Sequence, residues 1–280
     1  MTEIEKDKYK AVWLSHSSIG DYLKCPRLYF LRNVYKNPLS RRKFTIMNPP
    51  LALGQVVHEV IESLSFLPTN ERFQYPLHKN FEVSWQKVGG EKGGFRNHEQ
   101  ESEYKDRGLK MLKNLEENPG PILMKALKLK SEDGLPYYWF PEEENIILCG
   151  KIDWIEYLDA SNSIHIIDFK TGRNEEDDAS LQLPIYLLLA KNLQKREVSK
   201  ASYWYLEKPN GMTEVELPEI EDSVEKVRKI ASRIKLVRQL NHFVCESNGC
   251  RYCIPFEKVA HGGGKLVGLS DYGQEIYIEK

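Results

Sequence analysis

Two short apolar runs of the sequence each carry an aspartate, and the second run also carries a lysine. Asp153 lies in the run 150–155, and Asp168 and Lys170 lie in the run 166–172. Aspartate is disfavoured in strands and costly to bury, so two of them on paired strands need a cation nearby. Because Asp168 and Lys170 are separated by one residue, they project from the same face of a strand. The pattern therefore predicts two carboxylates and an amine aimed at one point.

This group of side chains suits the hydrolysis of a phosphodiester. Aspartate oxygens hold Mg²⁺ or Mn²⁺, which neutralises the phosphate and lowers the pKa of a bound water. Lys170 would orient or deprotonate that water, or stabilise the developing negative charge. Beside a metal in a partly dry cleft, we expect the pKa of this amine to be lowered. The alternative from the residues alone is that Asp168 and Lys170 form an incidental surface ion pair at the end of a strand.

Five segments follow one another in the order found in a known family. They are the cysteine motif at 14–30, Leu53-Gly54-Gln55-Val56-Val57-His58, Gly150-Lys151-Ile152-Asp153, Asp168-Phe169-Lys170-Thr171-Gly172 and Gln182-Leu183-Pro184-Ile185-Tyr186. In this order they resemble the PD-(D/E)xK nuclease superfamily, and within it the RecB-like exonuclease branch. That branch includes the nuclease domains of RecB and AddB and the CRISPR-associated RecB-like nucleases. Any one segment is a weak signal, whereas five in the right order across most of the chain are a strong one.

The resemblance assigns a role to the polar side chains of these segments. It implies that Lys170 is the catalytic lysine and that the metal ligands are His58, Asp153, Asp168 and the carbonyl of Phe169. It also implies that Gln182 and Tyr186 line the site and position DNA or the lysine. These two are four residues apart and share one face of a helix, so they can act together. Taken singly, either of them, or His58, is more often an ordinary packed or surface residue, and we expect Glu62 to be exposed to solvent.

Five cysteines occur, and an odd number in a chain without an export signal argues against a disulfide framework. Cys245, Cys250 and Cys253 fall within nine residues, which indicates ligation of a metal or a cluster. The resemblance implies that they join Cys25 to hold a [4Fe–4S] cluster, which needs four thiolates and closes the domain like a clasp. The remaining cysteine, Cys149, is expected to be a buried apolar residue.

The order of the cysteines departs from the one that the resemblance leads us to expect. A Cys-x2-Cys pair should come first and the last cysteine some residues after it. Here Cys245 precedes the pair, and no cysteine follows Cys253. Four thiolates also suit a structural Zn²⁺ site, and reduced cysteines without a metal are a further alternative. The sequence leaves these three alternatives open.

The spacing of apolar residues and the turn signals predict the elements that position the site. Pro26 should divide the first helix in two, with Ser17 or Ser18 as its cap. We expect a basic loop at 37–50, an exposed turn at 89–94, polar turns at 142–145 and 159–162, and a glycine hinge at 262–264 before a β-like tail. We expect helices at 15–34, 52–66, 99–117, 181–193 and 221–243, and strands at 137–141, 146–157, 163–170 and 201–206.

These elements predict an α/β fold in which a central mixed sheet is flanked by helices. The resemblance implies a restriction-endonuclease-like core within a single nuclease domain that spans 1–280. The catalytic core should cover about 50–210, and the cysteine clasp should form from about 15–35 and 243–256.

The net charge of −1 argues against a uniformly basic nucleic-acid binder but leaves room for a local basic groove. The helix at 221–243 has a basic face, and the loop Arg41-Arg42-Lys43 is basic as well. Both are candidate contacts to a DNA backbone, although a solvated surface is the plainer interpretation of the helix. Exposed aromatic residues could stack bases. The expected substrate is DNA, either single-stranded or with a frayed end.

The resemblance implies an exonuclease in DNA repair, recombination or CRISPR-type processing. A helicase or another CRISPR or recombination protein is a candidate partner, since the chain has no Gly-rich Walker loop and hence no motor of its own. Two alternatives are a catalytically silent nucleic-acid-binding or scaffold module and a structure-selective endonuclease. No long apolar run and no signal peptide occur, so we expect no membrane span and a cytoplasmic location.

Overall fold

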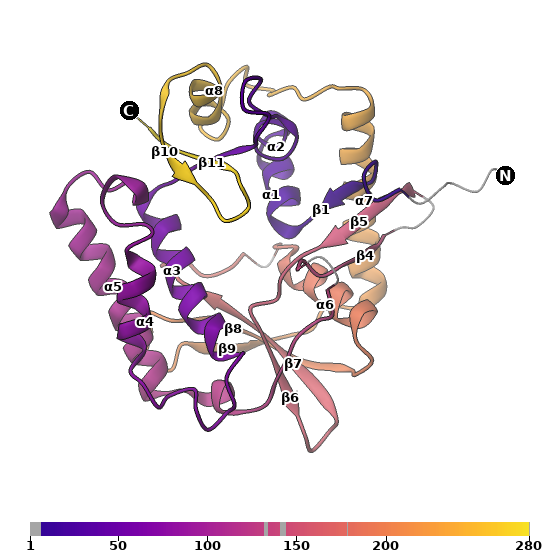
Figure 1. Cartoon of the computed structure of the whole chain (residues 1–280). Coiled ribbons are helices and arrows are strands. Elements are labelled where there is room, and N and C mark those ends of the chain that lie inside the picture. Colours follow the sequence, from indigo (N-terminus) through magenta and orange to yellow (C-terminus); the bar gives the residue numbers. More distant parts are fainter. Residues whose placement is uncertain (1–6, 132–133, 141–143, 178, 280) are drawn as a thin grey trace.

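A five-stranded sheet lies at the centre of the structure, in the order β3-β6-β7-β8-β9 (Figure 1). The structure is a computed structural model that describes residues 7–131, 134–140, 144–177 and 179–279. β7 and β8 pair in parallel and the other neighbours pair antiparallel, so the predicted α/β fold with a central mixed sheet is confirmed. The strands are β3 (Ala126–Leu127), β6 (Trp154–Leu158), β7 (Ser163–Lys170), β8 (Val198–Tyr205) and β9 (Met212–Val215).

The two faces of β7 enter two different cores, because successive residues of a strand point to opposite sides of the sheet. Ile164 and Ile166 belong to one core, and Ile167 and Phe169 belong to the other. Fully burying one such side chain stabilises a fold by about 1.5–3 kcal/mol, so β7 is fixed from both sides. The first core is covered by α6 (Gln182–Leu193) and α7 (Ile220–Gln239), and the second by α3 (Pro49–Leu64), α4 (Leu77–Trp85) and α5 (His98–Glu117).

A second sheet of three strands packs against α6, in the order β1-β5-β4. The predicted strand 146–157 is wrong, since the chain leaves this sheet after Cys149 and enters the central sheet as β6. Gly150 follows directly, and a Cβ atom there would lie 3.1 Å from Cδ1 of Leu189, so the close approach of α6 favours glycine. The strands are β1 (Val12–Leu14), β4 (Tyr137–Trp139) and β5 (Ile146–Cys149).

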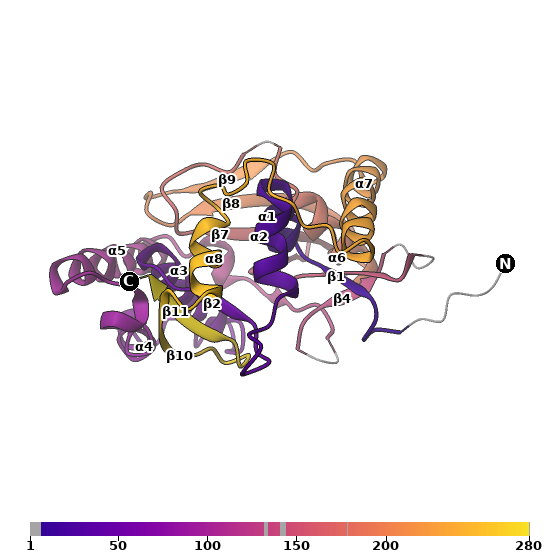
Figure 2. The ribbon, with the colours of Figure 1, turned by 90° about the horizontal axis from the view of Figure 1, so that it is seen from above.

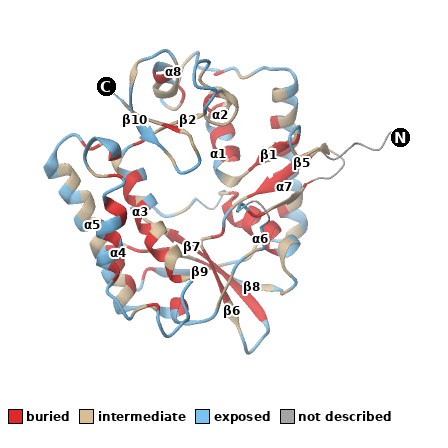
Figure 3. Cartoon of the chain, viewed as in Figure 1, coloured by how far each residue is buried: buried red, intermediate tan, exposed pale blue. Residues whose placement is uncertain are grey.

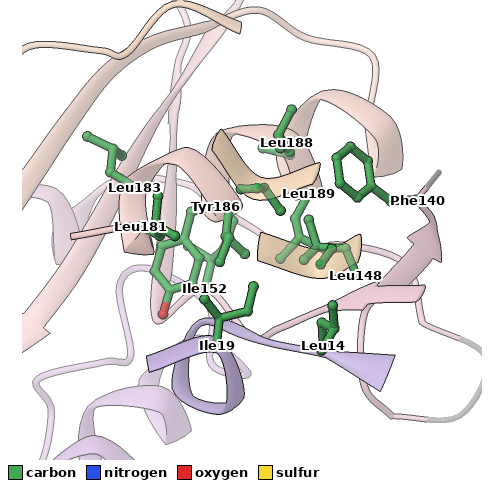
Figure 4. Close-up of a cluster of buried hydrophobic side chains, with 14 of the residues drawn as sticks. Leu14, Ile19, Phe140, Leu148, Ile152, Leu181, Leu183, Tyr186, Leu188 and Leu189 are labelled. Carbon is green, nitrogen blue, oxygen red and sulfur yellow. The ribbon is translucent and has the colours of Figure 1, made fainter. Parts of the chain in front are cut away.

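Helix α6 is apolar around most of its circumference because the central sheet, the three-stranded sheet and α7 all pack against it. Figure 4 shows Leu189 beside Leu148 of β5, and Tyr186 beside Ile152 and Ile19. Figure 3 shows the result, with buried residues along β7 and on the inner sides of α3 and α6. The helix that carries the predicted Gln182 and Tyr186 is therefore packed between the two sheets and α7.

The predicted first helix is divided at Pro26, as expected, into α1 (His16–Lys24) and α2 (Pro26–Tyr29). The cap is Ser15, however, and not Ser17 or Ser18. The Oγ atom of Ser15 accepts a hydrogen bond from the N–H of Ser18, whose own hydroxyl accepts one from the N–H of Ser15. This reciprocal pair is a capping box, so the helix begins earlier than the predicted cap. A π-helix, Phe30–Val34, continues the chain.

The predicted loop 37–50 contains a strand, β2 (Phe44–Ile46). This strand pairs in parallel with β11 (Glu275–Glu279), which pairs with β10 (Gly264–Leu269), so the β-like tail is confirmed and the loop is corrected. A local reading of the sequence misses β2 because its partner lies at the other end of the chain. The first and last parts of the chain thus lie side by side, as Figures 1 and 2 show. Asn48 then caps α3, which begins at Pro49.

The predicted helices 99–117, 181–193 and 221–243 correspond to α5, α6 and α7, although α7 ends earlier, at Gln239. Helices α4 and α8 (Ile254–Ala260) were not predicted. The turn at 89–94 is a 3₁₀-helix, Gly90–Gly93, and its last residue is buried. Pro141 and residues 142–143 of the predicted strand and turn lie outside the described residues. Among those that are described, no helix combines the length and the apolar character that a membrane crossing needs.

Candidate active site and cysteine cluster

His58 and Asp153 form one half of the candidate site. His58 is part of α3, and its Nδ1 atom lies 3.3 Å from Oδ1 of Asp153. The other oxygen of Asp153 accepts a hydrogen bond from the backbone N–H of Phe169, at 2.9 Å. Asp153 lies just before β6 and not inside a strand, which corrects the prediction. The chain passes from one sheet to the other at 150–153, and this change of direction brings the carboxylate to the end of β7.

Lys170 forms the other half of the site and has three close acceptors. Its Nζ atom lies 2.9 Å from Oδ2 of Asp168, 2.5 Å from Oε2 of Glu176 and 2.6 Å from Oε1 of Gln182. An ammonium group has three N–H donors, so all of them are used. The side chains of Lys170 and Asp168 are only 15% and 6% exposed, so the pair is buried and is not a surface ion pair. Both project from the face of β7 that α6 covers.

Gln182 connects the lysine to the carboxylate. Its amide nitrogen donates to Oδ1 of Asp168 at 2.6 Å and lies 3.1 Å from the hydroxyl of Tyr186, one turn further along α6. The shared helix face that the spacing predicted is therefore present. Burial, followed by the negative charges of Asp168 and Asp153, raises the pKa of Tyr186 well above its usual value, so the phenol stays neutral. The two α6 side chains thus bring neutral hydrogen-bonding groups to the buried end of the site.

The negative charge of the Asp168 carboxylate is only partly offset by the positive groups around it. Burial and, after it, the neighbouring charge of Asp153 raise its pKa to about 7, against the opposing effects of Lys170 and His58. The described side chains therefore do not supply enough positive charge for two ionised carboxylates. A cation bound between them would supply it.

The two cationic partners respond to the same carboxylates. Burial by itself would lower the pKa of His58, but the carboxylate of Asp153 outweighs it and the pKa is raised. Burial likewise opposes the charge of Lys170, but Asp168 and then Glu176 raise its pKa. These directions describe the protein without a metal, so the lowering of the Lys170 pKa beside a bound metal stays a prediction.

The donor set fits a divalent metal ion. Asp153 and Asp168 offer carboxylate oxygens of the kind that Mg²⁺ and Mn²⁺ prefer, and His58 adds an imidazole nitrogen. Burial and then the charge of Asp153 raise the pKa of Asp168, so a cation bound between the two carboxylates would offset their repulsion. Phe169 contributes its N–H to Asp153, while the role of its carbonyl as a further ligand stays a prediction.

Three side chains near the site were not predicted. Glu176 contacts Lys170 from the loop that follows β7, and its N–H donates to the hydroxyl of Tyr205 at 3.0 Å. The ring of Tyr203 lies 4.7 Å from Nζ of Lys170. His16 lies 3.5 Å from the hydroxyl of Ser180. The acidic run 175–178 after the acid-x-lysine strand was the only sequence signal, and nothing in it singles out Glu176.

Glu62 is not freely exposed, as the sequence led us to expect. It forms an ion pair with Lys151, and its side chain is 23% exposed. Its negative charge is also among those that raise the pKa of His58. Glu62 therefore lies at the rim of the site, where it pairs with Lys151.

The four predicted clasp cysteines lie together. The Sγ atoms of Cys25, Cys245, Cys250 and Cys253 are all within 4.8 Å of one another, and none of these residues forms a disulfide. They come from the junction of α1 with α2 and from the segment that leads into α8. An ion pair of 2.6 Å between Arg27 and Glu257 joins the same two parts of the chain.

The cysteine cluster also fits a metal centre. Burial opposes ionisation of Cys250, but hydrogen bonds from the backbone at Cys253 and Tyr252 lower its pKa to about 7. Burial raises the pKa of Cys253 and of Cys25, so the fit to a metal rests on the positions of the four sulfurs. Around a single Zn²⁺ ion at about 2.3 Å, four sulfurs would lie about 3.8 Å apart. Cys250 and Cys253 have this spacing, at 3.7 Å. A four-iron cluster is larger and would need the thiols to move apart. Cys149 lies elsewhere and is buried in an apolar cluster, as predicted.

Comparison with known proteins agrees with this geometry at the level of the superfamily. The model of the PD-(D/E)XK nuclease superfamily matches residues 13–256, a range that contains every residue of the candidate site and of the cysteine cluster. No curated protein matches the chain. The family match covers most of the chain, and the acid, lysine and glutamine of its central motif contact one another. The chain belongs to the PD-(D/E)XK nuclease superfamily.

Proposed function

We propose that this protein is a metal-dependent deoxyribonuclease that acts on single-stranded DNA or on DNA ends, as an exonuclease. The observation that carries the proposal is the buried contact of Lys170 with Asp168 and Gln182, beside a second carboxylate and a histidine. Superfamily membership supports hydrolysis of phosphodiesters. The preference for ends rests on the resemblance to the RecB and AddB nuclease domains.

In this proposal His58, Asp153, Asp168 and the carbonyl of Phe169 hold Mg²⁺ or Mn²⁺. When bound, the ion neutralises the phosphate and lowers the pKa of a water molecule. Lys170 directs an N–H group at the negative charge that develops on the phosphate or orients the attacking water.

Gln182 and Tyr186 act as positioning residues in the same proposal. Gln182 accepts from Lys170 and donates to Asp168, so it fixes the separation of the two groups that act on the phosphate. Tyr186, through its contact with the Gln182 amide, fixes the orientation of that amide.

The four clasp cysteines are proposed to hold a [4Fe–4S] cluster, as the resemblance implies. The spacing of the thiols favours Zn²⁺ as the alternative. Anaerobically purified protein distinguishes the two, because an iron–sulfur cluster absorbs near 400 nm and yields iron, whereas a zinc site is colourless and yields zinc. Five free cysteines suit a reducing compartment, so the proposal keeps the protein in the cytoplasm.

The biological setting in this proposal is DNA repair, recombination or CRISPR-type processing, with a helicase or a CRISPR or recombination protein as partner. These points rest on the resemblance to the RecB-like branch. A co-purification of the tagged protein from its own cells, followed by mass spectrometry, would support them by recovering such a partner.

The test of the activity is cleavage of end-labelled linear single-stranded DNA with Mn²⁺, with Mg²⁺ and with EDTA. We expect metal-dependent degradation by the wild type and by Lys191→Ala, an exposed lysine of α6 away from the site. We expect no degradation by Asp168→Ala or Lys170→Ala. If well-folded wild type with its metal centre intact cleaves nothing, the catalytically silent binding module replaces the proposal. Cleavage of circular single-stranded DNA would replace the exonuclease by a structure-selective endonuclease.

A further inference from the structure

A groove of about 820 Å³ opens beside the candidate site, where α6, α7 and the ends of β8 and β9 come together. Glu176 and Tyr203 line it, and these two residues also contact Lys170. The groove is therefore continuous with the candidate site. Its volume is near the upper end of the range of about 300–1,000 Å³ for small-molecule pockets, so it is large enough to bind a ligand.

The groove has an apolar floor and one basic wall. Leu181, Leu183, Pro184, Val215 and Ile230 form the apolar part. The basic wall is a stripe of α7, because residues three and four apart lie on the same face of a helix. Its cations are Lys226, Lys229 and Arg233.

These three cations are exposed, and none forms an ion pair within the part of the chain that the structure describes. The acids of the groove lie on other elements. Glu176 and Asp177 belong to the loop after β7, next to the proposed metal site, and Glu216 follows β9. Negative charge is thus concentrated mainly where a divalent metal would bind, and positive charge lies on the helix that forms the opposite wall.

We propose that this groove holds the single DNA strand that leads away from the cleaved bond, an inference that rests on the proposed function. The phosphates of the strand lie against Lys226, Lys229 and Arg233, and its bases pack on the apolar floor. A single strand offers both an apolar and an anionic surface, and proteins bind it by combining a basic groove with packing of the bases. A duplex cannot use the floor, because its bases are stacked and paired inside the helix.

The test compares two triple variants of the full-length protein. The groove variant is Lys226→Ala, Lys229→Ala and Arg233→Ala. The control variant is Lys79→Ala, Arg96→Ala and Lys110→Ala, which removes the same charge from exposed positions in or near α4 and α5. The affinity for labelled oligothymidylate of about 12 nucleotides is measured by fluorescence anisotropy in EDTA, over about 50 to 200 mM salt. A blunt duplex of the same length is measured in parallel.

For the groove variant we expect at least about tenfold weaker binding of the single strand at low salt, and a salt slope smaller by about 2, since each phosphate contact on a single strand contributes about 0.7. The control variant should change the slope much less. The inference is overturned if both variants behave alike. It is also overturned if the groove variant loses as much affinity for the duplex as for the single strand.

Hydrolysis of bis(p-nitrophenyl) phosphate with Mn²⁺ separates this inference from the proposed function. This small diester reaches the metal without using the groove, so the groove variant should hydrolyse it at the wild-type rate. If the wild type hydrolyses neither the diester nor DNA while groove-dependent binding persists, the proposed function fails and the groove inference stands. If the groove variant loses diester hydrolysis while its single-strand affinity is unchanged, the three residues act at the site and the groove inference fails.

Discussion

At the scale of single residues, the amine of Lys170 has no N–H group left for a substrate. All three of its N–H groups are directed at acceptors, and one of these, Glu176, comes from a loop and not from a strand or a helix. A phosphate or a water molecule that approaches the amine must replace one acceptor. We expect Glu176 to be the one replaced, because it lies on the loop after β7 and its negative charge repels the phosphate.

Replacing Glu176 by Gln is therefore expected to help substrate binding. We predict that the KM for single-stranded DNA falls by about two- to fivefold, the effect of one weak like-charge contact of roughly 0.5–1 kcal/mol, while kcat changes less. Steady-state cleavage of a labelled oligonucleotide measures both constants. A loss of kcat as large as that of Asp168→Ala would instead identify Glu176 as part of the catalytic group.

Gln182 is expected to be more important, because it contacts both Asp168 and Lys170 inside the buried part of the site. Gln182→Leu removes one hydrogen-bond partner from each of these groups, and we predict a loss of about 10- to 100-fold in kcat or in Mn²⁺ affinity. Tyr186→Phe removes only the hydroxyl next to this amide and serves as the milder comparison. Equal activity of Gln182→Leu and wild type at every Mn²⁺ concentration would contradict the assigned positioning role.

From the raised pKa of Asp168 we predict how the stability of the metal-free protein changes with pH. The folded form holds a proton up to a pKa of about 7, whereas the ordinary value is 3.8, so stability falls as the pH rises through this window. We predict that Asp168→Asn melts at a higher temperature than the wild type in EDTA at pH 8, with the difference absent at pH 4. Added Mn²⁺ should stabilise the wild type and not the variant. Thermal melts at the two pH values, with and without metal, test all three statements.

At the scale of elements, the cysteine cluster joins segments from the two ends of the chain. Cys25 lies where α1 meets α2, and the other three cysteines precede α8. The β10–β11 hairpin that follows α8 pairs with β2, which leads into α3 and its His58. A metal in the cluster would hold α2 and α8 together and so stabilise the helix that carries a proposed ligand of the active site.

Cys25→Ala is predicted to lose the metal of the clasp and to expose the C-terminal segment to protease. Arg27→Ala, two residues away, is the matched control. Its ion pair with Glu257 is a quarter to a third exposed, so it contributes about 0–1 kcal/mol. Iron and zinc analysis with limited proteolysis distinguishes the two variants. Equal metal content and equal proteolysis in both would contradict the clasp.

At the scale of the whole molecule, the features that the sequence predicted best are the contacts that depend on local spacing. Asp168 and Lys170 share a strand face, and Gln182 and Tyr186 share a helix face, so their contacts follow from periodicities of two and nearly four residues. The mixed sheet and the meeting of the four cysteines were also predicted, although the latter came from the resemblance. Spacing alone thus predicts the pairs that lie within one element, whereas the contact of His58 with Asp153 joins two distant parts of the chain.

The missed break between β5 and β6 and the missed strand β2 share a physical cause, since each depends on a partner distant in the sequence. The break between β5 and β6 is fixed by the packing of α6 at Gly150, and β2 exists only because β11 pairs with it. Glu176 lies in an acidic loop in which any of several residues had the right charge.

The most direct test of the central claim is to separate metal binding from cleavage at Lys170. Lys170→Met keeps the length of the side chain and removes its charge. The account predicts that this variant still binds Mn²⁺ by calorimetry, while single-turnover cleavage of end-labelled single-stranded DNA falls by at least about 10²–10³-fold. Asp168→Ala should lose both. Wild-type cleavage by Lys170→Met at a matched occupancy of Mn²⁺ would contradict the claim that this site performs the hydrolysis.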